Sequence, residues 1–203
     1  MIFWPIVVEE RNSSFNGKVQ VRQFLGQYSL VVNNLTQSGG LVKDIWWQAL
    51  KAVKHQAVNR VLILGVGGGT VVGLVTELWP EAQIVGVEID PVMITLGKKY
   101  LHLDTKQVKI IEADAEKWLS QDKDKFDLVI VDLYRGRRVM GVDKAKFLKQ
   151  LRQRLARGGI AIVNLLQIKE TRDQNKKLID KLKLIFTHAQ EVKTPSNRLL
   201  LVQ

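Results

Sequence analysis

The 203-residue sequence contains no cysteine. Disulfide bonds, thiolate nucleophiles and zinc sites built on cysteine are therefore excluded. The three histidines, His55, His102 and His188, are far apart in the sequence and have no metal-ligand spacing, so we expect no metal centre. The chain also lacks a Gly-x-Ser-x-Gly motif, which argues against the chemistry of α/β-hydrolases.

Long hydrophobic runs are absent as well. No apolar run reaches the roughly 18 residues that a membrane-spanning helix needs. The first residues, MIFWPIVVEE, are apolar, but no basic segment precedes them and they run directly into Glu9 and Glu10, unlike a secretory signal peptide. These absences predict a cytoplasmic protein without a membrane partner.

Acidic residues are few relative to basic ones: 20 Asp and Glu stand against 31 Lys and Arg, which gives a net charge of +11. Clustered basic residues neutralise phosphates, so a nucleic-acid partner is one interpretation of this excess. In residues 143–157, however, an apolar stripe occupies one side of a predicted helix, and the basic residues are spread over much of the remaining circumference. That dispersed pattern favours a solvated surface over a nucleic-acid site.

The order of the predicted elements indicates an α/β fold. Residues 6–33 are typical of short antiparallel strands, with a hairpin turn at Asn16-Gly17. From Arg60 onward, continuous apolar runs alternate with helical segments, which predicts a parallel sheet covered by helices on both faces. The C-terminal residues form a final predicted hairpin. We therefore expect an N-terminal β-hairpin unit over residues 1–36 and a Rossmann-like domain over residues 37–203.

Acidic residues follow the ends of three predicted strands. The first strand of the alternating region runs into a glycine-rich turn, GVGGGT, and the next three strands end at Glu88, Asp114 and Asp132. In such sheets ligands bind at the carboxyl ends of the strands, and glycines let them approach the N–H groups of a helix N-terminus. Glu88 is placed to accept ribose hydroxyls, and Asp114 to accept an adenine amino group. Together they predict a nucleoside site, although each acid alone is also explained as a helix N-cap.

The motifs GVGGGT, VEIDP, EADAEKWL and FDLVIVD resemble those of the class I S-adenosylmethionine-dependent methyltransferases, and more narrowly those of spermidine synthase and its relatives. The segment LVVNNLTQSGG is similar to the hairpin of that family, so the resemblance covers about residues 17–166. It implies a three-layer Rossmann-like methyltransferase fold. The sheet would be mostly parallel and seven-stranded with an antiparallel last strand, and a small N-terminal antiparallel β unit would precede it. The implied cofactor is S-adenosylmethionine or decarboxylated S-adenosylmethionine.

The same resemblance implies which residues form the site. Asp132 falls on the catalytic aspartate of the family, and Tyr134 follows it as a second catalytic residue that walls the acceptor pocket. Trp47 is expected to bind the substrate, where the family has a tyrosine. The cofactor would be held by the glycine turn, the strand-end acids with their neighbours, and an adenine-side glutamine: Gln37, Gly65, Val66, Gly67, Gly69, Glu88, Ile89, Asp114, Ala115 and Asp132.

Two positions depart from the aminopropyltransferases of that family. Gly68 replaces the acid that binds the amino end of decarboxylated S-adenosylmethionine, and Arg135 replaces a second acid beyond the catalytic one. A polyamine is cationic, and each like-charge contact at about 4 Å costs on the order of 4 kcal/mol at an effective dielectric near 20. Aminopropyl transfer to a polyamine is therefore disfavoured. Arg135, with Arg137 and Arg138 close behind, is expected to bind the substrate, a small-molecule acceptor for which an anion is one option; the alternative is that these arginines point to solvent or cap a neighbouring element.

The expected function is that of a spermidine synthase-like S-adenosylmethionine-dependent transferase. A methyltransferase acting on an unidentified acceptor is the simplest form, because methyl transfer needs no fixed base. The first alternative is an aminopropyltransferase of polyamine biosynthesis, and the second is a non-catalytic module that binds a nucleotide or a nucleic acid. The sequence leaves a homodimer open, because Ile2, Phe3 and Trp4 place apolar side chains at the edge of the N-terminal β unit.

Overall fold

The computed structural model describes residues 4–104, 107–135 and 138–203, and all side chains within them except those of residues 135, 138 and 139. Ile2 and Phe3, which were expected at an edge of the N-terminal β unit, lie outside the described residues. The neighbouring Trp4 is 80% exposed.

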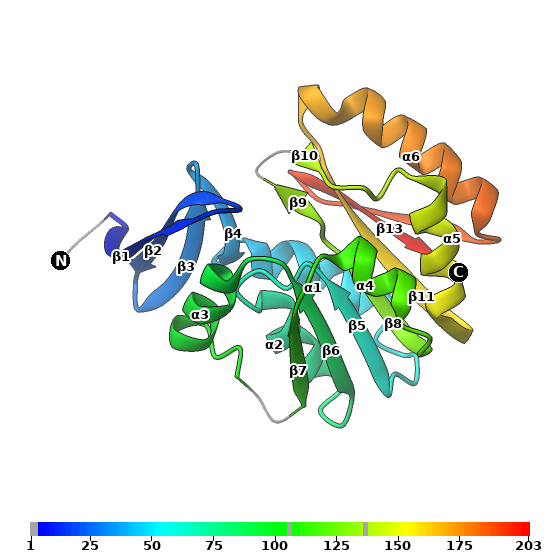
Figure 1. The fold of residues 1–203 in the computed structure, drawn as a ribbon, viewed down its shortest axis with the longest axis horizontal. Helices are drawn as coiled ribbons and strands as arrows, with labels where there is room; N and C mark the ends of the chain where they lie inside the picture. The colour runs from blue at the N-terminus through cyan, green and yellow to red at the C-terminus, as the bar shows by residue number, and fades with distance from the viewer. Residues whose placement is uncertain (1–3, 105–106, 136–137) are drawn as a thin grey trace.

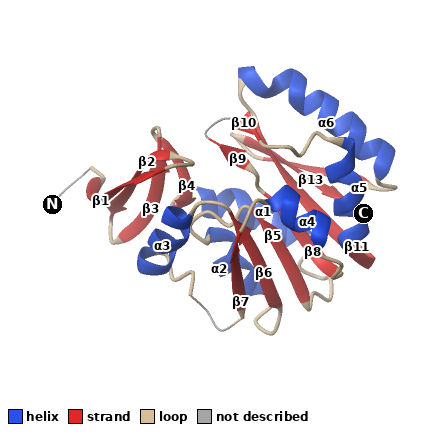
Figure 2. Ribbon diagram, viewed as in Figure 1, coloured by secondary structure: helices blue, strands red, loops and turns tan. Residues whose placement is uncertain are grey.

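The largest element is a seven-stranded sheet (Figures 1 and 2). Its strands are β5 (Arg60–Leu64), β6 (Gln83–Glu88), β7 (Val108–Glu112), β8 (Phe126–Val131), β11 (Leu155–Leu166), β12 (Ala189–Lys193) and β13 (Asn197–Val202). They lie in the order β12-β13-β11-β8-β5-β6-β7. The five strands from β11 to β7 are parallel, whereas β13 runs antiparallel to both of its neighbours. The predicted methyltransferase-type fold with an antiparallel last strand is confirmed.

Helices cover both faces of this sheet because successive side chains of its strands point to opposite sides. On β5, Val61 and Ile63 join one core cluster and Leu62 and Leu64 join another, and all four are fully buried. The first cluster includes α1 and α2, and the second includes α4, α5 and α6. The covering helices are α1 (Val42–Ala52), α2 (Thr70–Leu78), α4 (Ala115–Gln121), α5 (Ala145–Arg154) and α6 (Arg172–Ile185).

A separate four-stranded antiparallel sheet lies beside the main sheet and is drawn in blue in Figure 1. Its strands are β1 (Ile6–Ser13), β2 (Gly17–Phe24), β3 (Gln27–Val32) and β4 (Leu35–Gly39). A hairpin turn joins β1 to β2 as predicted, but it spans residues 14–16, and Gly17, with φ of 68°, is the first residue of β2. The strand β4 was not predicted, and it carries the antiparallel sheet to Gly39, past the expected boundary at residue 36. Asn33 and Asn34 join it to β3 with positive φ values of 49° and 59°, as a two-residue type I′ turn requires.

The N-terminal sheet is attached to the main domain by α3 (Pro91–Tyr100) and by the glycine turn. Its apolar face packs against Met93 and Leu96 of that helix. At the turn, Gly68 N–H donates to Ser38 Oγ over 2.7 Å, and Gly39 N–H donates to Thr70 Oγ1 over the same distance. These contacts hold the small sheet against the carboxyl edge of the large one.

Element boundaries differ from the predicted ones near residue 155. The helix expected over 143–157 ends at Arg154, and β11 begins at Leu155, because Leu155 already pairs with Phe126 before a register shift that ends at Ile160. Gly158, with φ of +78°, lies within that shift. The remaining short elements are β9 (Tyr134–Arg135), β10 (Arg138–Val139) and η1 (Lys169–Thr171). Among the helices of the described residues, none has the length and apolarity to span a bilayer.

Candidate active site

Three glycines of the turn between β5 and α2 adopt the left-handed backbone conformation, with φ values of +87° at Gly65, +57° at Gly67 and +96° at Gly69. A Cβ at Gly65 would lie 2.3 Å from the carbonyl oxygen of Asp132. The turn therefore approaches the end of β8 this closely only because residue 65 has no side chain. This approach joins the carboxyl ends of β5 and β8 at the predicted ligand-binding edge.

Glu88, the last residue of β6, faces the same turn. Its carboxylate accepts hydrogen bonds from the backbone N–H groups of Gly67 (2.8 Å), Ile89 (2.9 Å) and Asp90 (3.0 Å). Burial raises the pKa of the Glu88 carboxyl above its ordinary value, while the three N–H donors oppose that rise. The structure thus fixes one carboxylate beside the glycine turn.

A cavity of about 180 Å³ opens beside Glu88, and we call it the Glu88 cavity. It is lined by six of the predicted cofactor residues: Gly65, Glu88, Ile89, Asp114, Ala115 and Asp132. Asp114 also caps α4, because its Oδ1 accepts a hydrogen bond from Lys117 N–H over 2.9 Å. The two explanations offered for Asp114, N-cap and site residue, are therefore compatible.

A smaller cavity of about 60 Å³ adjoins the Glu88 cavity and shares Gly65, Glu88 and Asp132 with it. Three further predicted cofactor residues line it: Gln37, Val66 and Gly67. Gln37, expected on the adenine side, lines this small cavity and not the Glu88 cavity. Gly69 lines neither; it caps α2, and a Cβ there would lie 2.6 Å from Leu103 Cδ1.

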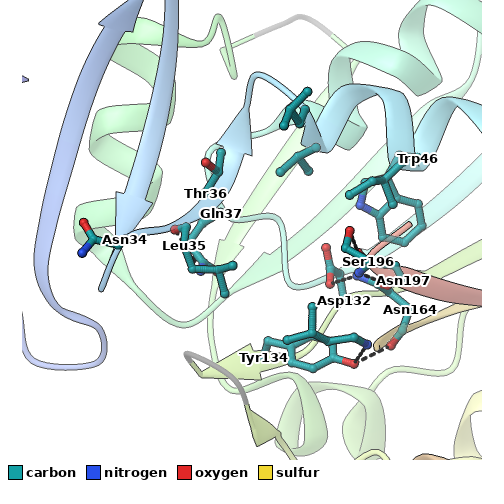
Figure 3. A pocket seen from close by; sticks show the side chains of 14 residues that line it. Asn34, Leu35, Thr36, Gln37, Trp46, Asp132, Tyr134, Asn164, Ser196 and Asn197 are labelled. Atoms are coloured by element: carbon teal, nitrogen blue, oxygen red, sulfur yellow. Dashed lines mark hydrogen bonds between the residues drawn. The ribbon is translucent and has the colours of Figure 1, made fainter. Parts of the chain in front are cut away.

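A third cavity, of about 290 Å³, lies on the other side of Asp132, and we call it the Trp46 cavity (Figure 3). Trp46 lines this cavity, whereas Trp47, which was predicted to line the substrate pocket, does not. Trp46 is 1% exposed and lies on the same helical face as Ala49 and Leu50. Trp47, one position further round α1, is partly buried at the edge of the core, with Lys51 Nζ 5.2 Å from its ring.

Asp132 lines all three cavities. Its Oδ1 accepts a hydrogen bond from Asn164 Nδ2 over 2.8 Å. Burial raises the pKa of Asp132 to about 6; hydrogen bonds from Asn164 and Trp46 moderate the rise, and the charge of Glu88 adds to it. A carboxyl group with a pKa near 6 is mostly ionised at neutral pH, yet it accepts a proton more readily than an ordinary aspartate.

Tyr134 also lines all three cavities, but its hydroxyl group is engaged. It donates to the carbonyl oxygen of Asn164 over 3.1 Å and accepts from Leu166 N–H over 2.6 Å. Burial raises the pKa of the Tyr134 phenol well above its ordinary value, so the group stays neutral. The arrangement suits a wall of the site better than a group that gives up its proton.

Sequence reasoning missed the residues that orient Asp132. Asn164 of β11 donates to Asp132, and its own Oδ1 accepts from Asn197 Nδ2 over 2.8 Å. Ser196 Oγ in turn donates to Asn197 Oδ1 over 2.6 Å. Figure 3 shows these side chains gathered below the indole of Trp46. One signal was available in the sequence. Asn164 is the single polar side chain in the apolar run GGIAIVNLL, and a buried polar side chain needs a hydrogen-bond partner.

The Trp46 cavity has a mostly apolar lining that includes one acidic side chain and several amides. Among its described lining residues, Asp132 is the one that carries a charge, and Asn34, Gln37, Asn164 and Asn197 add side-chain amides. The backbone of Arg135 belongs to β9, but its side chain lies outside what is described, as do Arg137 and the side chain of Arg138. The substrate-binding role of Arg135 stays a prediction. Within the described residues, no three His, Asp or Glu side chains form a group able to hold a metal ion.

Comparisons with known proteins agree with this geometry. Residues 61–159 match a family described as a methyltransferase domain. A probable polyamine aminopropyl transferase of Bifidobacterium longum is 28% identical over 97% of this chain and 47% of its own length. A probable spermidine synthase structure from Corynebacterium glutamicum covers 100% of this chain and 80% of its own, with a TM-score of 0.80 and 18% identity. A spermidine synthase in complex with the transition state analogue AdoDATO covers 97% of this chain and 71% of its own, with a TM-score of 0.79 and 14% identity.

The chain spans less than half the length of the first curated relatives that it matches, with shares of 47%, 37% and 45%. The structural likeness, at under a fifth sequence identity, establishes the fold. The matched methyltransferase domain and the relatives support a spermidine synthase-like family, and the structural neighbours show that the chain has the class I S-adenosylmethionine-dependent methyltransferase fold.

Proposed function

We propose that the chain transfers an aminopropyl group from decarboxylated S-adenosylmethionine to an amine, as its relatives named polyamine aminopropyltransferases are expected to do. The observation that carries the proposal is the position of Asp132. Its carboxylate, with a pKa raised to about 6, lies where the Glu88 cavity and the Trp46 cavity meet.

The Glu88 cavity fits the adenosyl part of the donor. The Glu88 carboxylate can accept the ribose hydroxyls, and Asp114 beside Ala115 can accept the adenine amino group. The positive φ values at Gly65 and Gly67 let the ligand approach the backbone without meeting a Cβ. These features support an S-adenosylmethionine-related ligand in this cavity.

A bound sulfonium donor supplies an electrophilic carbon, whose bond to sulfur breaks as the amine nitrogen forms a new bond to it, leaving methylthioadenosine. Asp132 accepts the proton that the attacking nitrogen loses. Trp46 and Tyr134 wall the acceptor side and keep water from the reacting atoms. Asn164 holds the Asp132 carboxylate in one orientation through its 2.8 Å hydrogen bond.

The lining of the Trp46 cavity supports a cationic acceptor. It combines the Asp132 carboxylate with side-chain amide oxygens, which accept hydrogen bonds from ammonium groups. Such a lining suits an amine acceptor. The anionic acceptor that Arg135 suggested from the sequence is not tested, because the side chain of Arg135 lies outside what is described.

Methyl transfer from S-adenosylmethionine is the second candidate, and Gly68 favours it. Aminopropyltransferases of the family carry an acid there, but a Cβ at Gly68 would lie 2.6 Å from Leu30 Cδ1, 2.7 Å from Leu101 Cδ1 and 2.9 Å from Ser38 Cβ. Position 68 therefore faces the N-terminal sheet and α3. Without a carboxylate there, position 68 contributes no charge that would hold the amino end of an aminopropyl group or repel the carboxylate of S-adenosylmethionine.

The nucleoside product separates the two candidates. The protein is incubated with putrescine and either donor, and the products are identified by mass spectrometry. Methylthioadenosine formed from the decarboxylated donor establishes aminopropyl transfer; S-adenosylhomocysteine formed from S-adenosylmethionine establishes methyl transfer. Calorimetry then measures the binding of methylthioadenosine and of S-adenosylhomocysteine. Binding without turnover of the decarboxylated donor would count against aminopropyl transfer to putrescine, and a folded protein that binds neither nucleoside would refute the proposal.

A further inference from the structure

The turn between β1 and β2 is one wall of the Glu88 cavity. Phe15 and Asn16, from this turn, line the cavity together with Glu88 and Asp114. The sequence placed these two residues in a hairpin without any relation to the site. Their position depends on how the N-terminal sheet is held at this point.

Two buried side chains hold the turn. The hydroxyl group of Ser13 donates to Asp90 Oδ2 over 2.5 Å, and its oxygen accepts the backbone N–H groups of Phe15 (2.9 Å) and Asn16 (3.0 Å). Asn16 Nδ2 also donates to Asp90 Oδ2, over 2.6 Å. Ser13 thus uses its one proton and both of its lone pairs, so its orientation is fixed.

Asp90 connects this turn to the ribose side of the cavity. It is fully buried, and its Oδ1 accepts Val92 N–H over 2.9 Å, which caps α3. Its own N–H donates to Glu88 Oε1 over 3.0 Å. One carboxylate therefore binds the turn with one oxygen and the helix with the other, two residues away from Glu88.

We propose that Ser13 and Asp90 are positioning residues for the donor: they form a latch that sets the wall made by Phe15 and Asn16, and adenosyl ligands bind tightly only when the latch is closed. The inference rests on the proposed function, because it takes the Glu88 cavity as the site of the adenosyl group. The latch lies outside the Trp46 cavity, so it acts on the donor and not on the acceptor.

Two variants open the latch in different ways. Ser13→Ala removes the bridging hydroxyl and leaves the charge of Asp90 and the cap of α3 in place. Asp90→Asn keeps an oxygen for Val92 N–H, since asparagine caps as well as aspartate. The NH₂ group of the new asparagine then takes the place of the oxygen that accepted hydrogen bonds from Asn16 and Ser13. Because all three groups are donors, these two hydrogen bonds are lost.

Glu9→Gln is the matched control. Glu9 Oε2 accepts Lys99 Nζ and Tyr100 Oη, each over 2.6 Å, so it also ties β1 to α3. None of these three residues lines the Glu88 cavity. The control therefore loosens the same two elements without touching the wall.

The test is calorimetry with methylthioadenosine and with S-adenosylhomocysteine, together with the KM of each substrate. We expect the Kd for the nucleoside to rise about tenfold in Ser13→Ala and in Asp90→Asn, which corresponds to the loss of about one hydrogen bond. The KM of the donor rises with it while the KM of the amine does not change. Glu9→Gln should bind within about twofold of the wild type.

Wild-type affinity in Ser13→Ala would overturn the latch while leaving the proposed function standing, and so would an equal loss in Glu9→Gln. If Asp90→Asn fails to fold, Ser13→Ala decides alone. A wild-type protein that binds neither nucleoside would instead refute the proposed function, and the latch with it.

Discussion

Replacing Asn164 with leucine is expected to raise the pKa of Asp132 from about 6 to between about 7 and 8. Asn164 Nδ2 donates to Asp132 Oδ1 over 2.8 Å, and this bond favours the ionised carboxylate. A hydrogen bond to a charged acceptor contributes about 1.5–3 kcal/mol, which at about 1.4 kcal/mol per pKa unit corresponds to one to two units. Leucine has a similar volume and no donor.

The change is measured by ¹³C NMR titration of the aspartate carboxyl groups, with Asp132→Asn to assign the signal. In the active enzyme, the acid limb of kcat/KM against pH should move upward by the same amount, because that limb reports the base of the free enzyme. At pH 7 the ionised fraction of Asp132 would fall from about nine-tenths to between about one-half and one-tenth. Turnover at that pH should fall in proportion.

Asn197→Ala provides the control for this prediction. Asn197 donates to Asn164 and not to Asp132, so its loss disturbs the same network one step further away. We expect a shift of the Asp132 pKa of less than about half a unit. An Asp132 pKa that stays near 6 in Asn164→Leu, or equal shifts in both variants, would refute the role given to this hydrogen bond.

Further outcomes follow from the same structure. Because the folded-state pKa of Asp132, about 6, lies above the ordinary value of 3.8, the native state binds more protons than the unfolded state between these values. The stability of the wild type relative to Asp132→Asn should therefore fall by about 3 kcal/mol as the pH rises through that window, measured by urea unfolding at both ends. Gly65→Ala should lower the free energy of unfolding by about 2 kcal/mol or more, because it forces a Cβ against a carbonyl oxygen in a residue with positive φ. Gly73→Ala, in open space on α2, should instead raise the free energy of unfolding by about 0.5–1 kcal/mol, and thermal melts of both glycine variants check these two outcomes. Trp46→Ala should lower the free energy of unfolding by about 3–5 kcal/mol, because that side chain is fully buried. The loss in Trp47→Ala should be clearly smaller.

Much of the fold was predictable because its strands are continuous apolar runs. The strands β5, β6, β8 and β11 and the helices between them follow directly from such patterns. By contrast, β4 has the sequence LTQSG, which carries no apolar alternation. It is held in place by pairing with β3 and by the contact of Ser38 with the glycine turn, and neither interaction can be read from local sequence.

Some residues of the candidate site were likewise predictable from the sequence, and others were not. The acids at the strand ends were predictable, since parallel strands bring their carboxyl ends to one edge. The partners of Asp132 were not, because Asn164 and Asn197 come from later strands and meet through tertiary packing. The sequence could have shown that Trp46, and not Trp47, lies on the buried face of α1. Trp46, Ala49, Leu50 and Val53 follow the spacing of such a face.

The strand order explains why a single carboxylate serves both cavities. In the main sheet, β8 lies between β5 and β11. Residues on the β5 side come from the ends of β5, β6 and β7 and from the β1–β2 turn, and together with residues 140–144 they line the Glu88 cavity. Residues on the β11 side come from β11, the terminal hairpin and α1, and together with residues 34–37 of the N-terminal sheet they line the Trp46 cavity. A residue at the carboxyl end of β8 reaches both sides, whereas an acid at the end of β6, such as Glu88, lines the donor side alone. In the proposed reaction, the topology of the sheet therefore favours Asp132 as the group that meets donor and acceptor together.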